Sequence, residues 1–315
     1  MTVPMAGLSR PAQWTTIGEC SMSPTTEQRE QTVGRAIREI SHIATLPEIT
    51  LKIIDLVEDP KSTAQDLHQV ISGDPALCSR ILKVVNSSFY GLPGQIGSIN
   101  RAIVMLGLNA VKNIAIAASL AKLFRGGELT PAFSARDLWK HSNATAAAAK
   151  IMADRQKLGL GDEAYLAGLM HDIGIMVEMQ YDRASLIEVI EQVGEDADGN
   201  PTAEMLEIED SVYGANHEDY GKALCERWKF PKSFASVAGF HHDPMSAPEE
   251  HRLLVTLVSV SDIVAASINF GFRLDRMSFD VPAEQLELLG LNEADLPEIR
   301  EAVEEAVANI DTSLA

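Results

Sequence analysis

The sequence predicts an all-α protein. Apolar residues recur at helical spacing in almost every segment from Glu27 onward, whereas no segment alternates polar and apolar residues as a strand would. Hydrophobic residues make up 46% of the 315 residues, which is enough for a large buried core. Clusters of Gly, Pro and Ser separate the apolar segments, as expected for helices joined by short loops.

Several of the expected helices begin at recognisable capping residues. A Ser, Thr or Asp at the N-cap accepts a hydrogen bond from a free backbone N–H of the first turn, and Pro fits the first helical position. The predicted starts are Ser62 or Thr63 followed by Gln65 and Asp66, then Asp74-Pro75, and then Ser134 with Asp137 before Leu138-Trp139.

Breaks in the helical pattern divide the chain into four parts. Pro, Ser, Thr and Gly without periodicity predict a flexible lead-in, and Gly126-Gly127 closes the first helical half. An acidic helix from Asn292 to Asp311 is expected to form an amphipathic cap or a homodimer surface. The expected parts are residues 1–25, a smaller helical half over 26–127, a larger one over 128–275, and an extension over 276–315.

The charge balance argues against a nucleic-acid partner. The chain carries 26 Lys and Arg against 45 Asp and Glu, a formal net charge of −19. Binding to a nucleic-acid backbone depends on basic side chains that neutralise phosphates. The stretch from Ser98 to Ala118 resembles a helix-turn-helix but has no basic recognition face, so we do not expect it to bind DNA. A small phosphorylated ligand stays open as a partner.

The cysteines and the apolar segments predict a cytoplasmic protein. Cys20, Cys78 and Cys225 lie far apart and form no CxxC pair, which suits a reducing compartment. No basic segment followed by an apolar one marks a signal peptide. The most apolar stretch, Ala102 to Phe124, contains Asn and Lys and predicts buried helices, so no membrane association is expected.

Five of the eight histidines fall in an ordered series with two aspartates. Each group lies in a predicted helix or at a helix end, and imidazole and carboxylate groups converging from several elements could bind one or two divalent ions. The ions could be Fe, Mn, Zn or Ni, which these ligands do not distinguish. The series is His141, His171-Asp172, His217, His241-His242 and Asp262.

Adjacent ligands require a break in a helix, because successive side chains point about 100° apart. Near such a break His171 could bind one ion while Asp172 bridges two, and Gly174 would loosen the backbone there. The same reasoning applies to His241-His242. Asp262 lies in an apolar helix, where a carboxylate needs a cation or strong hydrogen bonds.

The remaining residues in this half have ordinary interpretations or open ones. Asp137, one turn before His141, is either a first-turn acid or a further ligand. Lys140 and Lys222 are candidate cations for a phosphate group. Trp139 and Trp228 are expected in the core, and His42, His68 and His251 are expected to be ordinary histidines.

The order of the series resembles the HD superfamily of metal-dependent phosphohydrolases and, in its fuller form, the HD-GYP cyclic-dinucleotide phosphodiesterases. The rest of residues 35–270 is similar more specifically to the HDOD family, the HD-related output domain of bacterial signalling proteins. The phrases that carry this likeness are Leu46-Pro47, Ile71 to Leu77, Ile81 to Ser87, Ser98 to Gly107, Leu138 to Ser142 and Ala167 to Gly174.

The resemblance implies an HD-type helical bundle with a smaller N-terminal helical subdomain. It matches His141, His171, Asp172 and Asp262 to the minimal HD metal site, and the other three histidines to the additional ligands of HD-GYP sites. HDOD proteins often lack these ligands, whereas this chain keeps them. The motif HDxGK, however, has Ile175 here in place of its phosphate-holding lysine, and Asp243-Pro244-Met245 stands where GYP would follow His241-His242.

Two functions therefore stay open. The first is a regulatory HDOD protein that acts in signal transduction through a protein partner and uses metal as a structural or sensory element. The second is a phosphohydrolase acting on a nucleotide or cyclic dinucleotide, in which Asp172 would work with a metal-bound water.

Overall fold

The computed structural model confirms the all-α prediction. It describes residues 24–40, 48–59, 61–87, 90–121, 123–124 and 127–308, so nearly all of the predicted lead-in at 1–25, and His42, lie outside the described residues. Strands in the described part are limited to one small antiparallel hairpin, β1 (Glu128–Thr130) with β2 (Phe133–Ser134), too short for the sequence pattern to reveal. Within these same ranges no helix is both long and apolar enough to cross a bilayer.

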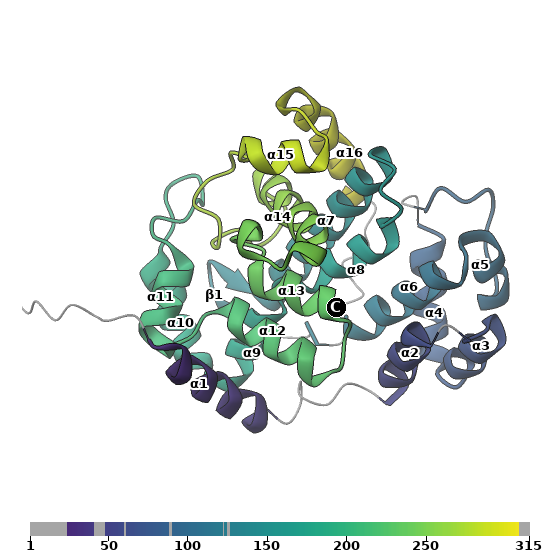
Figure 1. Cartoon of the computed structure of the whole chain (residues 1–315), viewed down its shortest axis with the longest axis horizontal. Helices are drawn as coiled ribbons and strands as arrows, with labels where there is room; N and C mark the ends of the chain where they lie inside the picture. Colours follow the sequence, from purple (N-terminus) through teal and green to yellow (C-terminus); the bar gives the residue numbers. More distant parts are fainter. Residues whose placement is uncertain are drawn as a thin grey trace, which may run out of the picture.

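A first group of helices precedes the hairpin and lies on the right in Figure 1. The apolar helix α6 is its centre: α2, α4 and α5 pack against α6, and α6 also contacts α8 of the second group. The helix α6 is buried along most of its length. The group comprises α2 (Glu48–Glu58), α3 (Ala64–Ser72), α4 (Pro75–Val85), α5 (Ile99–Leu106) and α6 (Leu108–Leu120).

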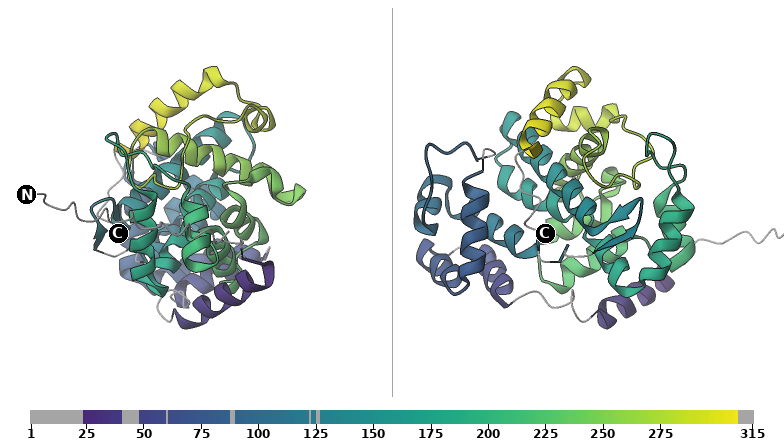
Figure 2. Two further views of the ribbon diagram at one scale, coloured as in Figure 1. Left: turned by 90° about the vertical axis from the view of Figure 1, so that its left-hand side faces the viewer. Right: turned by 180° about the vertical axis from the view of Figure 1, so that it is seen from behind.

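The second group forms the larger bundle (Figure 1, Figure 2). Its central helix is α7, which packs against α8, α14 and α16. The buried alanines of α7 allow these close contacts: a Cβ on Gly168 of α8 would lie only 2.9 Å from the Cα of Ala146. The group comprises α7 (Ala135–Arg155), α8 (Gly161–Met170), α9 (Ile173–Tyr181), α10 (Arg183–Val193), α11 (Met205–Tyr213), α12 (His217–Arg227), α13 (Lys232–Phe240), the 3-10 helix Pro244–Ser246 and α14 (Glu249–Ser267).

The first helix of the chain, α1 (Thr26–Glu39), lies beside the second group, at the lower left of Figure 1. It contacts α9 and α12. Arg29 holds it there, with ion pairs of 2.5 Å to Asp210 and 2.7 Å to Asp219. The domain boundaries expected from the sequence stay a prediction.

The predicted caps are confirmed. Thr63 and Asp66 form a reciprocal capping box at α3, and Asp74 accepts a hydrogen bond from the backbone N–H of Leu77 at the start of α4. Ser134 caps α7 by accepting from the N–H of Asp137. These starts are local, which explains why sequence alone located them.

Two further helices follow α14 beyond an irregular segment. We call residues 268–282, between α14 and α15, the strap; it is the yellow-green loop in Figure 1. It leads to α15 (Ala283–Leu289), the 3-10 helix Glu293–Asp295 and α16 (Leu296–Ala308). The acidic helix α16 buries its apolar side against α7 and α14, as an amphipathic cap does, and the predicted end at Asp311 lies outside the described residues.

Candidate metal centre

All seven residues of the predicted series come together inside the larger bundle. His141 comes from the first half of α7, Asp262 from α14, and His217 is the first residue of α12. The two adjacent pairs lie at helix ends, as their spacing required: His171-Asp172 in the turn between α8 and α9, and His241-His242 after α13. We call His141, His171, Asp172, His217, His241, His242 and Asp262 the His/Asp cluster.

One half of the cluster surrounds the Nε2 atom of His141. This atom lies 3.0 Å from Asp262 Oδ1, 3.2 Å from His171 Nε2 and 3.7 Å from Asp172 Oδ2. Metal–nitrogen and metal–oxygen bonds of about 2.0–2.2 Å place neighbouring ligand atoms roughly 3 to 3.5 Å apart. The spacing therefore fits four donor atoms around one divalent ion.

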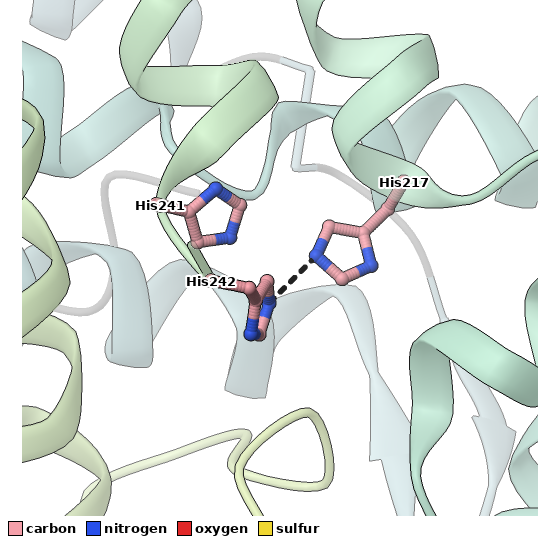
Figure 3. A group of neighbouring side chains, drawn as sticks. All are labelled: His217, His241 and His242. Atoms are coloured by element: carbon pink, nitrogen blue, oxygen red, sulfur yellow. Dashed lines mark hydrogen bonds between the residues drawn. The ribbon is translucent and has the colours of Figure 1, made fainter. Parts of the chain in front are cut away.

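The other half comprises the three remaining histidines (Figure 3). His217 Nε2 lies 3.0 Å from His242 Nε2, and His241 Nε2 lies 3.3 Å from Asp172 Oδ1. Asp172 thus turns Oδ2 to the first half and Oδ1 to the second, an orientation in which its carboxylate could bridge two ions. Donor atoms of His217, His241 and His242 all lie within 4.8 Å of one another.

Hydrogen bonds at the outer ring nitrogens orient three of the imidazoles. The Nδ1 atom of His171 lies 2.7 Å from Gly168 O, that of His241 3.2 Å from Val237 O, and that of His217 2.9 Å from Glu209 Oε2. Each of these oxygens accepts a hydrogen bond, so Nδ1 carries a hydrogen and Nε2 is the nitrogen that faces the cluster. A metal ion bound at Nε2 would displace any proton there and keep the hydrogen on Nδ1.

Glu209 anchors His217 twice, and a second buried acid lies behind it. Besides its contact with Nδ1, Glu209 accepts a hydrogen bond of 3.0 Å from the backbone N–H of His217. Burial and the charge of Glu209 raise the pKa of Glu178 well above its usual value. Burial beside Glu209 thus favours the protonated form of Glu178. Neither acid stood out in the sequence, because isolated glutamates in helices are common.

The strap adds two charged residues that the sequence did not single out. Asp275 is 2% exposed, and its carboxylate shares with His141 and Asp172 a group of donor atoms within 4.8 Å. Arg276 binds Asp262 Oδ2 through Nε at 2.5 Å and donates a 3.0 Å hydrogen bond to His241 O. Arg276 thereby leaves Asp262 only Oδ1 to present to the cluster.

The buried charges leave an excess of negative charge. Three carboxylates, Asp172, Asp262 and Asp275, face one guanidinium, Arg276. Among the described residues, both oxygens of Asp172, both of Asp275, Oδ1 of Asp262 and Nε2 of His241 have no hydrogen-bond partner although they are buried. Buried polar groups without partners are rare in native proteins. These atoms fit divalent ions.

The pKa values reflect the same excess. Burial lowers the pKa of His171, but the carboxylates of Asp172 and Asp262 outweigh burial and raise it to about 10. Burial, with the nearby charges of Asp262 and Asp172, raises the pKa of Asp275 to about 7. Without a cation, His171 and Asp275 thus tend to hold protons. A metal ion bound at the cluster would displace these protons.

Burial keeps His241 and His242 neutral. Desolvation lowers the pKa of His241, and desolvation together with the charge of Arg276 lowers that of His242 well below its usual value. Neutral imidazoles are the form that binds a metal. These two rings therefore carry no proton that an incoming ion must displace.

Other candidates from the sequence lie outside the cluster. Asp137 is held by Ser134 Oγ at 2.7 Å and by Lys140 Nζ at 2.6 Å, so it serves as a first-turn acid and Lys140 is paired with it. Lys222 lies over the ring of Phe240, 5.3 Å from its centroid. Trp139 and Trp228 are buried, His68 contacts Ser72, and His251 contacts Ser236.

Gly174 has a different role from the one expected. Its backbone lies within α9 and it is not among the glycines with positive φ. A Cβ there would lie 1.8 Å from His217 O and 2.8 Å from Gly221 N, so the glycine allows α9 to touch α12. It places His217 near Asp172 and does not loosen the turn. Ile175, next to it, is fully buried in the core.

Comparisons with known proteins agree with this architecture. A model of the HDOD domain family matches residues 43–244. An uncharacterised protein of Treponema pallidum (strain Nichols) is 25% identical over 244 residues, covering 75% of this chain and 45% of that protein. The chain thus spans less than half the length of this curated relative.

Solved structures share the fold at low sequence identity. An HDOD domain protein of unknown function from Geobacter sulfurreducens has a TM-score of 0.71 at 23% identity, covering 90% of this chain and 99% of that one. A Shewanella amazonensis SB2B protein provisionally named a phosphohydrolase has a TM-score of 0.67 at 24% identity. The match covers 87% of this chain and 93% of that one. A Marinobacter aquaeolei VT8 protein provisionally named a signal transduction protein has a TM-score of 0.68 at 20% identity. The match covers 90% of this chain and 66% of that one.

Proposed function

Since this chain belongs to the HDOD domain family, we propose that it is a regulatory domain whose His/Asp cluster holds one or two divalent metal ions in a structural or sensory role. Its output would be contact with a signalling protein partner. The metal would not serve in hydrolysis.

The donor set supports metal binding. Two groups of atoms, around His141 and around His217, have ligand spacing, and Asp172 offers one oxygen to each. When bound, the ions would neutralise the buried carboxylates and tie α7, the α8–α9 turn, α12, the end of α13 and α14 together. Because the unfolded chain has no such site, metal binding would add directly to the stability of the bundle.

The observation that carries the regulatory role is that the cluster is closed. Six of its seven residues are fully buried, and the side chain of His242 is 11% exposed. The strap lies over it, with Arg276 bound to Asp262 and Asp275 turned toward the donor atoms. Structural metal sites are closed, whereas catalytic ones keep an open position. A phosphate ester could reach the ions only after the strap had moved.

A second candidate, a metal-dependent phosphohydrolase, has one observation in its favour. The bridging position of Asp172 is typical of two-metal sites that activate a water between the ions. Arg276 could hold a phosphate, but only after its ion pair with Asp262 had broken. Ile175 offers no charge in place of a lysine. The two functions make opposite predictions for turnover.

Elemental analysis of the purified protein tests the metal site. We expect up to two divalent transition-metal ions per wild-type chain, and loss of metal in the double variant His171→Ala plus Asp172→Ala. His68→Ala, at a histidine whose contact is with Ser72, is the matched control and should keep the wild-type content. A metal-free wild type, or equal content in the double variant, would overturn the site.

Turnover decides between the two functions. Wild-type protein reconstituted with Mn²⁺, Fe²⁺ or Zn²⁺ is incubated with bis(p-nitrophenyl) phosphate, nucleoside triphosphates and cyclic dinucleotides. We expect no hydrolysis above the level of the double variant. Hydrolysis that depends on His171 and Asp172 would refute the regulatory proposal and support the phosphohydrolase.

A further inference from the structure

The strap carries a buried carboxylate, Asp275, that faces the His/Asp cluster. We propose that Asp275 is an additional metal ligand, supplied by the strap, and that metal binding at the His/Asp cluster locks residues 268–282 over the centre. This inference rests on the proposed function, because it needs the cluster to hold metal. It adds a ligand that neither the sequence pattern nor the family likeness points to.

Asp275 is placed as a ligand but has no hydrogen-bond partner among the described residues. Both carboxylate oxygens are buried and accept no hydrogen bond from any described residue. Oδ2 lies 3.7 Å from His242 Nε2, and the carboxylate also lies with His141 and Asp172 in one group of donor atoms. It therefore faces both halves of the cluster. A single cation beside Asp172 could reach it.

Apart from Arg276, the strap is held by hydrogen bonds to backbone oxygens and by the buried ring of Phe272, which packs edge-on against Phe133 and His141. Phe272 N–H donates to Asp137 O at 3.0 Å, and Arg273 Nε donates to Gly199 O at 3.0 Å. Gly271 lies so close to α7 that a Cβ would be 2.4 Å from Asp137 O. These contacts position the strap across α7 and the 194–201 loop, and they are indifferent to the charge in the cluster.

Asp275 makes closure depend on charge. In the closed strap it is a third buried carboxylate beside Asp172 and Asp262, with Arg276 as the nearby guanidinium. The nearest oxygens of Asp172 and Asp275 lie within 4.8 Å of each other, and like charges this close repel where water is excluded unless protons or a cation offset them. A divalent ion turns that repulsion into attraction, so closure favours metal binding and metal binding favours closure by the same factor.

Hydrogen–deuterium exchange of wild-type protein with Mn²⁺ or with EDTA tests the locking of the strap without any variant. We expect Mn²⁺ to slow exchange at least tenfold in peptides that cover 268–282. Mn²⁺ binding measured by electron paramagnetic resonance, with no change in strap exchange, would overturn the locking of the strap while leaving the metal site intact. A wild type that binds no Mn²⁺ would overturn both the proposed function and this inference.

The variant Asp275→Asn tests the ligand. It keeps the shape but loses the charge, so we expect its Mn²⁺ affinity to fall at least tenfold and its metal-free form to melt no lower than wild type. At saturating Mn²⁺, the peptides of α8 and α13 should be protected while the strap is not. Asp280→Asn, at an exposed acid of the same segment, is the control and should match wild type. Wild-type affinity and strap protection in Asp275→Asn would refute the role of Asp275.

Discussion

Gly174→Ala is expected to destabilise the protein and to disturb the half of the cluster around His217. A Cβ at this position would lie 1.8 Å from His217 O, 2.7 Å from His217 C and 2.8 Å from Gly221 N. All three are backbone atoms of α12, so no side chain can rotate away. Non-bonded heavy atoms need well over 3 Å. One helix must therefore move by more than about 1 Å relative to the other.

The size of the effect follows from two opposing contributions. Overpacking a well-packed interior costs about 1–3 kcal/mol, and contact with rigid backbone places this site at the upper end. Alanine favours the helical state by about 1 kcal/mol over glycine. The expected net loss is about 2 kcal/mol, which corresponds to a Tm lower by roughly 4–8 °C. The shift of α12 also moves His217 away from Asp172.

Thermal melts and elemental analysis measure both effects. The matched control is Gly34→Ala in α1, where the new Cβ would meet only the end of the Arg38 side chain at 3.3 Å. The control should be as stable as wild type or more stable by up to about 1 kcal/mol. Gly174→Ala should have the lower Tm and less than the wild-type metal content. A Gly174→Ala protein with wild-type Tm and metal content would refute the steric reasoning.

Three further predictions concern the surroundings of the cluster. Glu209→Gln should lower the affinity for an ion next to His217 about 10–100-fold, because the carboxylate that orients the His217 imidazole is gone. The affinity for an ion next to His141 should not change. Elemental analysis during stepwise chelation measures both, and equal loss of the two ions would contradict this prediction. Glu178 has a raised pKa, so above the usual glutamate value of 4.5 the unfolded chain has lost a proton that the folded protein keeps. The stability of the metal-free protein should therefore fall as pH rises from about 5 to 8, and Glu178→Gln should flatten this profile in urea titrations, whereas parallel profiles would argue against a buried neutral Glu178. Burial raises the pKa of the Cys225 thiol to about 12, so iodoacetamide at pH 8 should modify Cys225 only after unfolding, and mass spectrometry showing equal rates in native and urea-treated protein would contradict its burial.

The sequence by itself determined the helices and the order of the cluster. Caps such as Thr63 with Asp66 act between residues three positions apart, so their outcome is local and visible in the chain. The adjacent pairs His171-Asp172 and His241-His242 required helix ends, and the structure has them there. Both kinds of prediction depend only on the geometry of one helix.

Only the tertiary structure decided which residues complete the centre. Asp275, Arg276 and Glu209 carry no motif, and nothing in their neighbours along the chain distinguishes them from surface residues. They become significant because long-range packing removes water from them and brings them to within a few ångströms of the cluster. Gly174 shows the same limit, because its role is to allow the contact between α9 and α12. It is 43 residues from His217 in the chain but adjacent to it in space. A sequence lists the groups that can bind a metal, but burial and contact between distant segments decide which charges must be neutralised.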